Sequence, residues 1–187
     1  MTTYNEMKRK VLALIEELNP NNANLTDDPD IAAKYMAVAN QILFELARIK
    51  KIAKYIEIAV KEGDLVDYET ISGELGYDVY QLGTVGGVNY SIKANGTVLK
   101  VLESGTMEID CFVYPQMITA KNAEKYQYEL SQDALEVMPY GIAADLLKSD
   151  VSTEYGTIYA TRYESMKQML DPRYHKTSVY IEGGVSI

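Results

Sequence analysis

The stretch LEVMPYGIAADLLKSD, residues 135–150, is apolar or small at nearly every position before its closing Lys-Ser-Asp. Ile142 and Ala143 would occupy different faces of a helix, and a helix that is apolar all round is stable only when other elements surround it. Pro139 lacks a backbone N–H and collides with the preceding helical turn. We therefore expect a kink or restart near Val137, with Pro139 in the first turn of the restarted helix.

Two further segments have the apolar spacing of amphipathic helices. One covers residues 4–18, and Thr3 and Glu6 fit a capping box at its start. The other covers residues 155–170. Because only a short connection separates this last helix from residues 135–147, we expect the two to form an antiparallel hairpin.

The longest periodic segment has nine apolar residues separated by three or four positions. They are Ile31, Tyr35, Val38, Ile42, Leu46, Ile49, Ala53, Ile56 and Val60. Asp28 is the expected N-cap, with Pro29 as the first helical residue. A helix of about 34 residues would be roughly 50 Å long. Such a helix indicates an elongated molecule or packing beside copies of itself; a long, kinked core helix is the alternative.

From residue 65 to residue 118 the apolar period changes to two, which is typical of strands. The expected strands are residues 79–83, 88–93, 97–103 and 106–114. Gly86-Gly87, Asn95-Gly96 and Ser104-Gly105 supply turns between them. The pattern predicts an antiparallel sheet of about four or five strands and an α+β fold, while residues 121–130 fit neither pattern clearly.

These patterns divide the chain into three parts. Residues 1–64 and 119–172 form an antiparallel helical bundle, residues 65–118 an inserted β domain, and residues 173–187 an extended C-terminal arm. The sequence SVYI in the arm is strand-like, so the arm would either add a strand to a neighbouring sheet or remain without fixed structure.

Composition limits the chemistry that the chain can perform. Its one cysteine, Cys111, and its one histidine, His175, are far apart in sequence, so we expect no nucleophile–base pair. Sequence motifs of nucleotide binding, metal binding and covalent catalysis are missing. We therefore predict a non-enzyme with no catalytic residue, no cofactor and no metal site.

Charge and tyrosine content also carry information. The net charge of −9 argues against binding to phosphate backbones. The sequence has no membrane-helix run and no signal pattern, which predicts a cytoplasmic protein.

The chain has 16 tyrosines and no tryptophan. Tyrosine is favoured where surfaces meet, so we expect many interfaces; half-buried tyrosines on the surface of one chain are the alternative.

Two stretches carry a family resemblance: MPYGIAADLLKSD at residues 138–150 and YGTIYATRYESMKQMLDPR at residues 155–173. They resemble the head-to-tail connector, or adaptor, proteins in the neck of tailed bacteriophages. Members carry an apolar Pro-Tyr stretch, an Ala-Ala-x-Leu-Leu core, a short Ser/Asp break and a helix with an Arg-Tyr pair. The helix order and the β insert extend the resemblance loosely over most of the chain. The insert is larger than in small connectors and is similar to the adaptors of short-tailed phages.

The resemblance implies a virion structural protein that is present in the host cytoplasm during assembly. It would form a homo-oligomeric ring, a dodecamer, below the portal protein and continue the DNA channel to the tail proteins. DNA would pass through without specific binding because carboxylates repel it, and no membrane is involved. The central helix of the bundle would place Leu135, Met138, Ile142 and Leu146 in the core. The arm would dock on neighbouring components through Ser178, Val179, Tyr180, Ile181 and Val185.

The alternative function is a soluble module that binds a ligand or a protein through the β insert. That reading predicts a concave pocket lined by tyrosines on residues 65–118. The adaptor reading predicts self-assembly instead.

Overall fold

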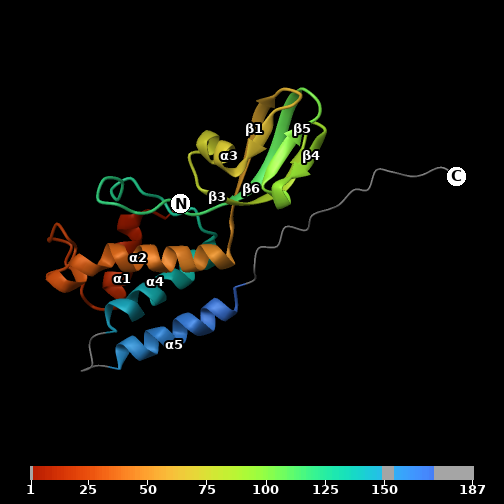
Figure 1. The fold of residues 1–187 in the computed structure, drawn as a ribbon. Coiled ribbons are helices and arrows are strands. Elements are labelled where there is room, and N and C mark those ends of the chain that lie inside the picture. The colour runs from red at the N-terminus through yellow and green to blue at the C-terminus, as the bar shows by residue number, and fades with distance from the viewer. Residues whose placement is uncertain (1, 149–153, 171–187) are drawn as a thin grey trace. The chain divides into compact units, whose positions relative to one another are not determined.

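The computed structural model describes residues 2–148 and 154–170 (Figure 1). In this part of the chain the fold is mixed α+β, as predicted, with five α-helices and two three-stranded sheets. The described residues form two compact units. Unit 1 contains residues 2–52, 114–148 and 154–170, and unit 2 contains residues 53–113.

Unit 1 is built from four helices: α1 (Tyr4–Leu14), α2 (Pro29–Ile49), α4 (Gln132–Leu146) and α5 (Tyr155–Gln168). Helix α4 packs against α1, α2 and α5 and lies between α2 and α5 in the view of Figure 1. Residues 121–130, which fit neither sequence pattern clearly, are neither a helix nor a strand, and turns cover 120–125. Helix α4, which is apolar on all sides, is thus the helix that α1, α2 and α5 all contact.

The predicted starts of α1 and α2 are confirmed. The Thr3 hydroxyl accepts a hydrogen bond from the Glu6 N–H at 3.2 Å, and the Glu6 carboxylate accepts one from the Thr3 N–H at 2.7 Å. These two bonds complete a capping box. The Asp28 carboxylate accepts bonds from two backbone N–H groups in the first turn of α2, at 2.7 and 3.1 Å, with Pro29 at the first helical position.

The prediction of one helix over residues 31–60 is wrong. Helix α2 ends at Ile49, and strand β1 (Ile52–Val60) follows, with side chains that alternate between exposed and half-buried positions. Apolar residues four positions apart fit both a helix and a strand. Pairing with β6 (Gly105–Val113) selects the strand. The first segment of unit 1 therefore ends at residue 52, well before residue 64, the boundary expected from the sequence.

Unit 2 contains two small sheets in place of the single sheet expected. One has the strand order β1, β6, β3 (Val79–Gly86); the other has the order β2 (Leu65–Asp67), β5 (Val98–Val101), β4 (Tyr90–Lys93). The four predicted strands are confirmed, and the Asn95-Gly96 turn joins the antiparallel pair β4 and β5. Gly86-Gly87 does not close a hairpin, because β3 pairs antiparallel with β6. Helix α3 (Tyr68–Leu75), capped by Asp67, was not predicted.

Helix α4 is continuous, so the predicted restart near Val137 is wrong. Pro139 lies inside the helix, where proline costs about 3 kcal/mol relative to alanine. Ten of the fifteen residues of α4 are buried. Each fully buried large apolar side chain contributes about 1.5–3 kcal/mol, and Met138 and Ile142 are both 0 % exposed. Burial of these side chains offsets the cost of the proline.

Four tyrosines cluster in unit 1. The rings of Tyr4 and Tyr35 meet edge to face at 5.7 Å, and those of Tyr126 and Tyr128 at 5.3 Å. The Tyr126 hydroxyl donates a hydrogen bond to the Gln116 carbonyl at 2.7 Å. The hydroxyls of Tyr35 and Tyr128 are buried and have no hydrogen-bond partner among the described residues. Burial raises the pKa of both, and it raises the pKa of Tyr4 to about 12.

Replacing Gly87 by alanine tests the close approach of the β3–β4 connection to β6. Gly87 has a φ of +82°, and an added Cβ would lie 2.2 Å from the Thr106 carbonyl oxygen. In urea unfolding we expect the free energy of unfolding to fall by about 1–2 kcal/mol because alanine disfavours the left-handed backbone. The overlap of the new Cβ with the Thr106 carbonyl oxygen should lower it by about 1–3 kcal/mol more. Gly63→Ala is the matched control, since Gly63 has a φ of +93° and no atom within 4 Å of the added Cβ. Equal losses in the two variants would contradict the overlap.

Tyr35→Phe removes a buried hydroxyl that has no partner. We expect the free energy of unfolding at neutral pH to stay the same or to rise by about 1–3 kcal/mol. The folded state raises the pKa of Tyr35, so its neutral form stabilises the fold fully below about pH 10, and this contribution is lost as the pH rises further. The variant should therefore lose stability less steeply in urea titrations above about pH 10.

Tyr126→Phe is the control for that experiment. Its hydroxyl donates to Gln116, so its removal should cost about 1 kcal/mol at neutral pH. A larger loss for Tyr35→Phe than for Tyr126→Phe would show that the Tyr35 hydroxyl does have a partner.

Candidate functional site

The two stretches that carry the phage-adaptor resemblance lie against each other. The guanidinium of Arg162 in α5 lies 4.4 Å from the ring centroid of Tyr140 in α4. The next residues also meet: a Cβ added at Gly141 would lie 2.7 Å from a ring carbon of Tyr163. Gly156, at the start of α5, faces the C-terminal end of α4 at close range. Gly156, early in α5, thus lies beside the last turn of α4, whereas Tyr163, later in α5, lies beside Gly141, about two turns further back in α4. The predicted antiparallel hairpin is therefore confirmed.

The structure places the four predicted core residues of α4 inside unit 1. Leu135, Met138, Ile142 and Leu146 are 5, 0, 0 and 5 % exposed. The predicted docking residues Ser178, Val179, Tyr180, Ile181 and Val185 lie outside the described residues, as does His175.

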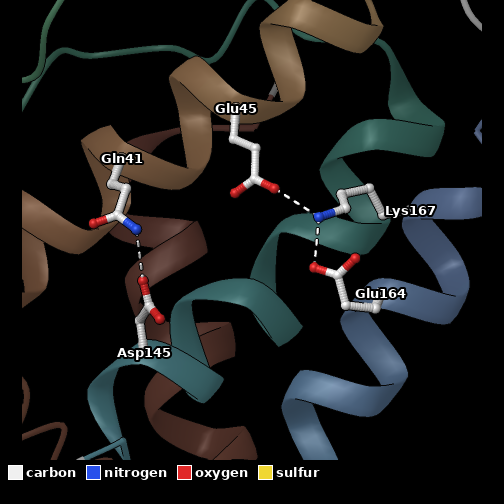
Figure 2. Close-up of polar contacts among 5 residues, drawn as sticks. All are labelled: Gln41, Glu45, Asp145, Glu164 and Lys167. Atoms are coloured by element: carbon white, nitrogen blue, oxygen red, sulfur yellow. Dashed lines mark hydrogen bonds and ion pairs between the residues drawn. The ribbon is translucent and has the colours of Figure 1, made fainter.

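Polar contacts fasten α4 and α5 to α2 (Figure 2). The Lys167 ammonium donates to Glu45 at 2.7 Å and to Glu164 at 2.5 Å. The Gln41 amide donates to Asp145 at 3.0 Å. Burial acts to lower the pKa of Lys167, but its hydrogen bonds and charge interactions with the two glutamates outweigh burial and raise that pKa. Lys167 therefore remains charged at neutral pH and holds the C-terminal half of α5 to α2.

A separate face of α5 carries an exposed stripe, the outer seam: Tyr155, Ile158, Arg162, Ser165 and Met169. Its members recur at alternating steps of three and four, the spacing of a helix–helix seam. Tyr155, Ile158 and Met169 are 59, 54 and 78 % exposed. A shallow, mainly apolar groove of about 450 Å³ runs along this face. In the single chain, α5 thus presents a helix-packing pattern to solvent.

A second groove, the α1 groove, has a volume of about 210 Å³ and is lined by Leu14, Ile15, Glu16, Glu17, Leu147, Tyr155 and Tyr159. Helix α1 ends at Leu14, so its predicted end about one turn later is wrong. The helix stops because Glu16 has a φ of 62° and the Glu17 N–H bonds back to the Leu12 carbonyl. The Tyr159 hydroxyl donates to the Leu14 carbonyl at 2.7 Å, which satisfies one of the carbonyls left open at the helix end.

Cys111 is a poor candidate for a nucleophile. Its side chain is buried, and burial raises the pKa of the thiol; the charge of Asp110 raises it further, against an opposing effect of Lys54. The reactive thiolate is therefore disfavoured at neutral pH. In residues 2–148 and 154–170, no cluster of three or more His, Cys, Asp or Glu is placed to hold a metal ion. None of the helices in those ranges is long and apolar enough to cross a bilayer.

Comparison with known proteins gives no relative: no protein-family model matches the chain, and no curated protein is significantly similar to it. The geometry of unit 1 and the resemblance carried by residues 138–150 and 155–173 are therefore the basis for assigning a function.

The outer seam and the α1 groove were not identified from the sequence. The apolar residues of α5 were recognised as helical, but the buried stripe and the exposed stripe were not separated. The alternating spacing from Tyr155 to Met169 was the available signal. The α1 groove gave no comparable signal, because it depends on the backbone conformation of Glu16.

Gly141→Ala tests the close contact between α4 and α5. In an open helix this change stabilises by about 1 kcal/mol, but here the new methyl group would overlap the Tyr163 ring. We expect a net loss of about 1–3 kcal/mol in the free energy of unfolding. The control is Gly73→Ala in α3, where an added Cβ has no atom within 4 Å. That variant should be as stable as the wild type or more stable, and a stabilised Gly141→Ala variant would refute the contact.

Proposed function

We propose that the chain is a non-enzymatic structural protein of a tailed-bacteriophage virion, a head-to-tail connector or adaptor of the neck. In this proposal it assembles in the host cytoplasm as a homo-oligomeric ring, a dodecamer, beneath the portal protein. The ring continues the DNA channel to the tail. Residues 173–187 dock on the portal or tail proteins, with Tyr180 and Ile181 as anchors.

One observation carries the proposal. The two separate stretches that resemble adaptors meet at successive positions, Tyr140 with Arg162 and Gly141 with Tyr163. The Pro-Tyr-Gly and Arg-Tyr parts of the resemblance therefore have a common physical role, since together they join α4 to α5.

The arrangement of elements supports the same proposal. We interpret unit 1 as the antiparallel helical bundle of the adaptor and unit 2 as its inserted β domain, because the chain enters unit 2 after α2 and returns before α4. The chain has 27 acidic and 18 basic residues. Such an excess of carboxylates around a channel lets DNA slide without binding to its wall.

The alternative, a binding module that uses the β insert, has less support. It requires a Tyr-lined pocket on residues 65–118. The tyrosine cluster of Tyr4, Tyr35, Tyr126 and Tyr128 belongs to unit 1 instead. We therefore favour the adaptor.

Light scattering after size exclusion tests the proposal, with the full chain at several concentrations, alone and mixed with the portal protein of the same phage. We expect a species whose mass is a multiple of 21.0 kDa, seen by negative-stain microscopy as a ring with a central channel. Assembly only in the portal mixture would also support an adaptor. A 21.0 kDa monomer in every mixture, with the elution of the portal unchanged, would refute it.

A further inference from the structure

We propose that the outer seam of α5 in one copy docks in the α1 groove of a second copy, with Arg162 bound to Glu16 and Glu17. This inference rests on the proposed function, since it names the surfaces through which neighbouring copies of the ring contact each other.

The outer seam has the chemistry of one half of a helix interface. Its spacing is that of residues that face another helix, and Tyr155, Ile158 and Met169 are each more than half exposed in the single chain. An apolar stripe with polar residues on either side marks a contact surface rather than an ordinary solvated face. Three seam residues, Ile158, Arg162 and Ser165, also line the shallow groove of about 450 Å³.

Because of Arg162, the seam should favour a partner surface that carries negative charge. It is the one cation among the five seam residues, and none of the five is acidic. Its guanidinium lies over the Tyr140 ring, 4.4 Å from the centroid, and an arginine has five N–H donors with which it can also bind a carboxylate. The surface that fits the outer seam is therefore apolar with an acidic border.

The α1 groove offers that combination. Leu14, Ile15 and Leu147 supply apolar lining, and Glu16 and Glu17 supply the carboxylates. These two acids follow the C-terminal end of α1, where the helix dipole disfavours negative charge. The last turn of α1 contains no basic residue to compensate. A cation from another copy would stabilise both the carboxylates and the helix end.

The predicted contact also has the symmetry that a ring needs. The seam and the groove share Tyr155, but their other residues differ, so each copy can present Arg162 to one neighbour and Glu16 and Glu17 to the other. Such a heterologous contact closes into a ring when the rotation between copies allows it. A contact of the seam with its own counterpart would instead stop at a dimer.

Charge reversal tests the contact in the full chain. We expect Arg162→Glu, and separately the double variant Glu16→Arg with Glu17→Arg, to raise the concentration for half-maximal association about tenfold or more. The variant that combines all three changes should recover most of the association. Ile158→Glu should weaken it by a similar factor, whereas Ala160→Glu, an exposed position of α5 outside the seam, should not. Sedimentation gives the association, and circular dichroism melting confirms that each variant is folded.

The outcomes separate this inference from the ring itself. If rings form and all variants associate like the wild type, the docking surfaces are wrong and the adaptor proposal stands. If the single reversals weaken association but the combined variant does not recover it, the seam has another occupant and the pairing of Arg162 with Glu16 and Glu17 is refuted. A truncated chain that ends at Leu170 would then be compared with the Ile158→Glu variant. If it associates no better than that variant, residues 171–187 are the segment that occupies the seam. If the wild type associates neither alone nor with the portal, the proposed function itself fails.

Discussion

The organisation of unit 1 follows from a helix that has no polar face. Helix α4 buries ten of its fifteen residues, and an isolated helix of this composition would leave all of that apolar surface in water. The other three helices of unit 1 contact it. The small residue Gly141 lets the Tyr163 ring approach the backbone, and the burial gained on all sides allows Pro139 to remain in the helix.

Tyrosine serves this core in two ways. At some positions the hydroxyl fastens a chain segment: Tyr126 donates to the Gln116 carbonyl, and Tyr159 donates to the end of α1 at Leu14. At others, such as Tyr35, the ring fills the interior while the hydroxyl is buried without a partner among the described residues. Packing within one unit therefore explains these tyrosines. The exposed Tyr155 is different, since it lines the α1 groove and belongs to the outer seam.

Features with local signals were predictable from the sequence. The capping box at Thr3, the N-cap at Asp28, the helix of residues 155–168 and the Asn95-Gly96 hairpin each depend on residues close together in the chain. The end of α2 was not predictable, because the spacing of Ile52, Ile56 and Val60 fits either period, and only the distant strand β6 selects a strand. The separation into two sheets likewise depends on long-range pairing, of β3 with β6 and β2 with β5.

In the proposed ring, the composition of the outer seam would limit association before the ring can form. A seam of uniformly large apolar residues would bind copies tightly and without fixed register. Arg162 and Ser165 interrupt it, and a polar residue within a helix seam lowers affinity while specifying the partner and register. Each contact is then weak alone. In a closed ring every copy is held at two surfaces, so the second contact forms at a high effective concentration. We therefore expect assembly to be cooperative, with few small oligomers, once a template such as the portal brings copies together.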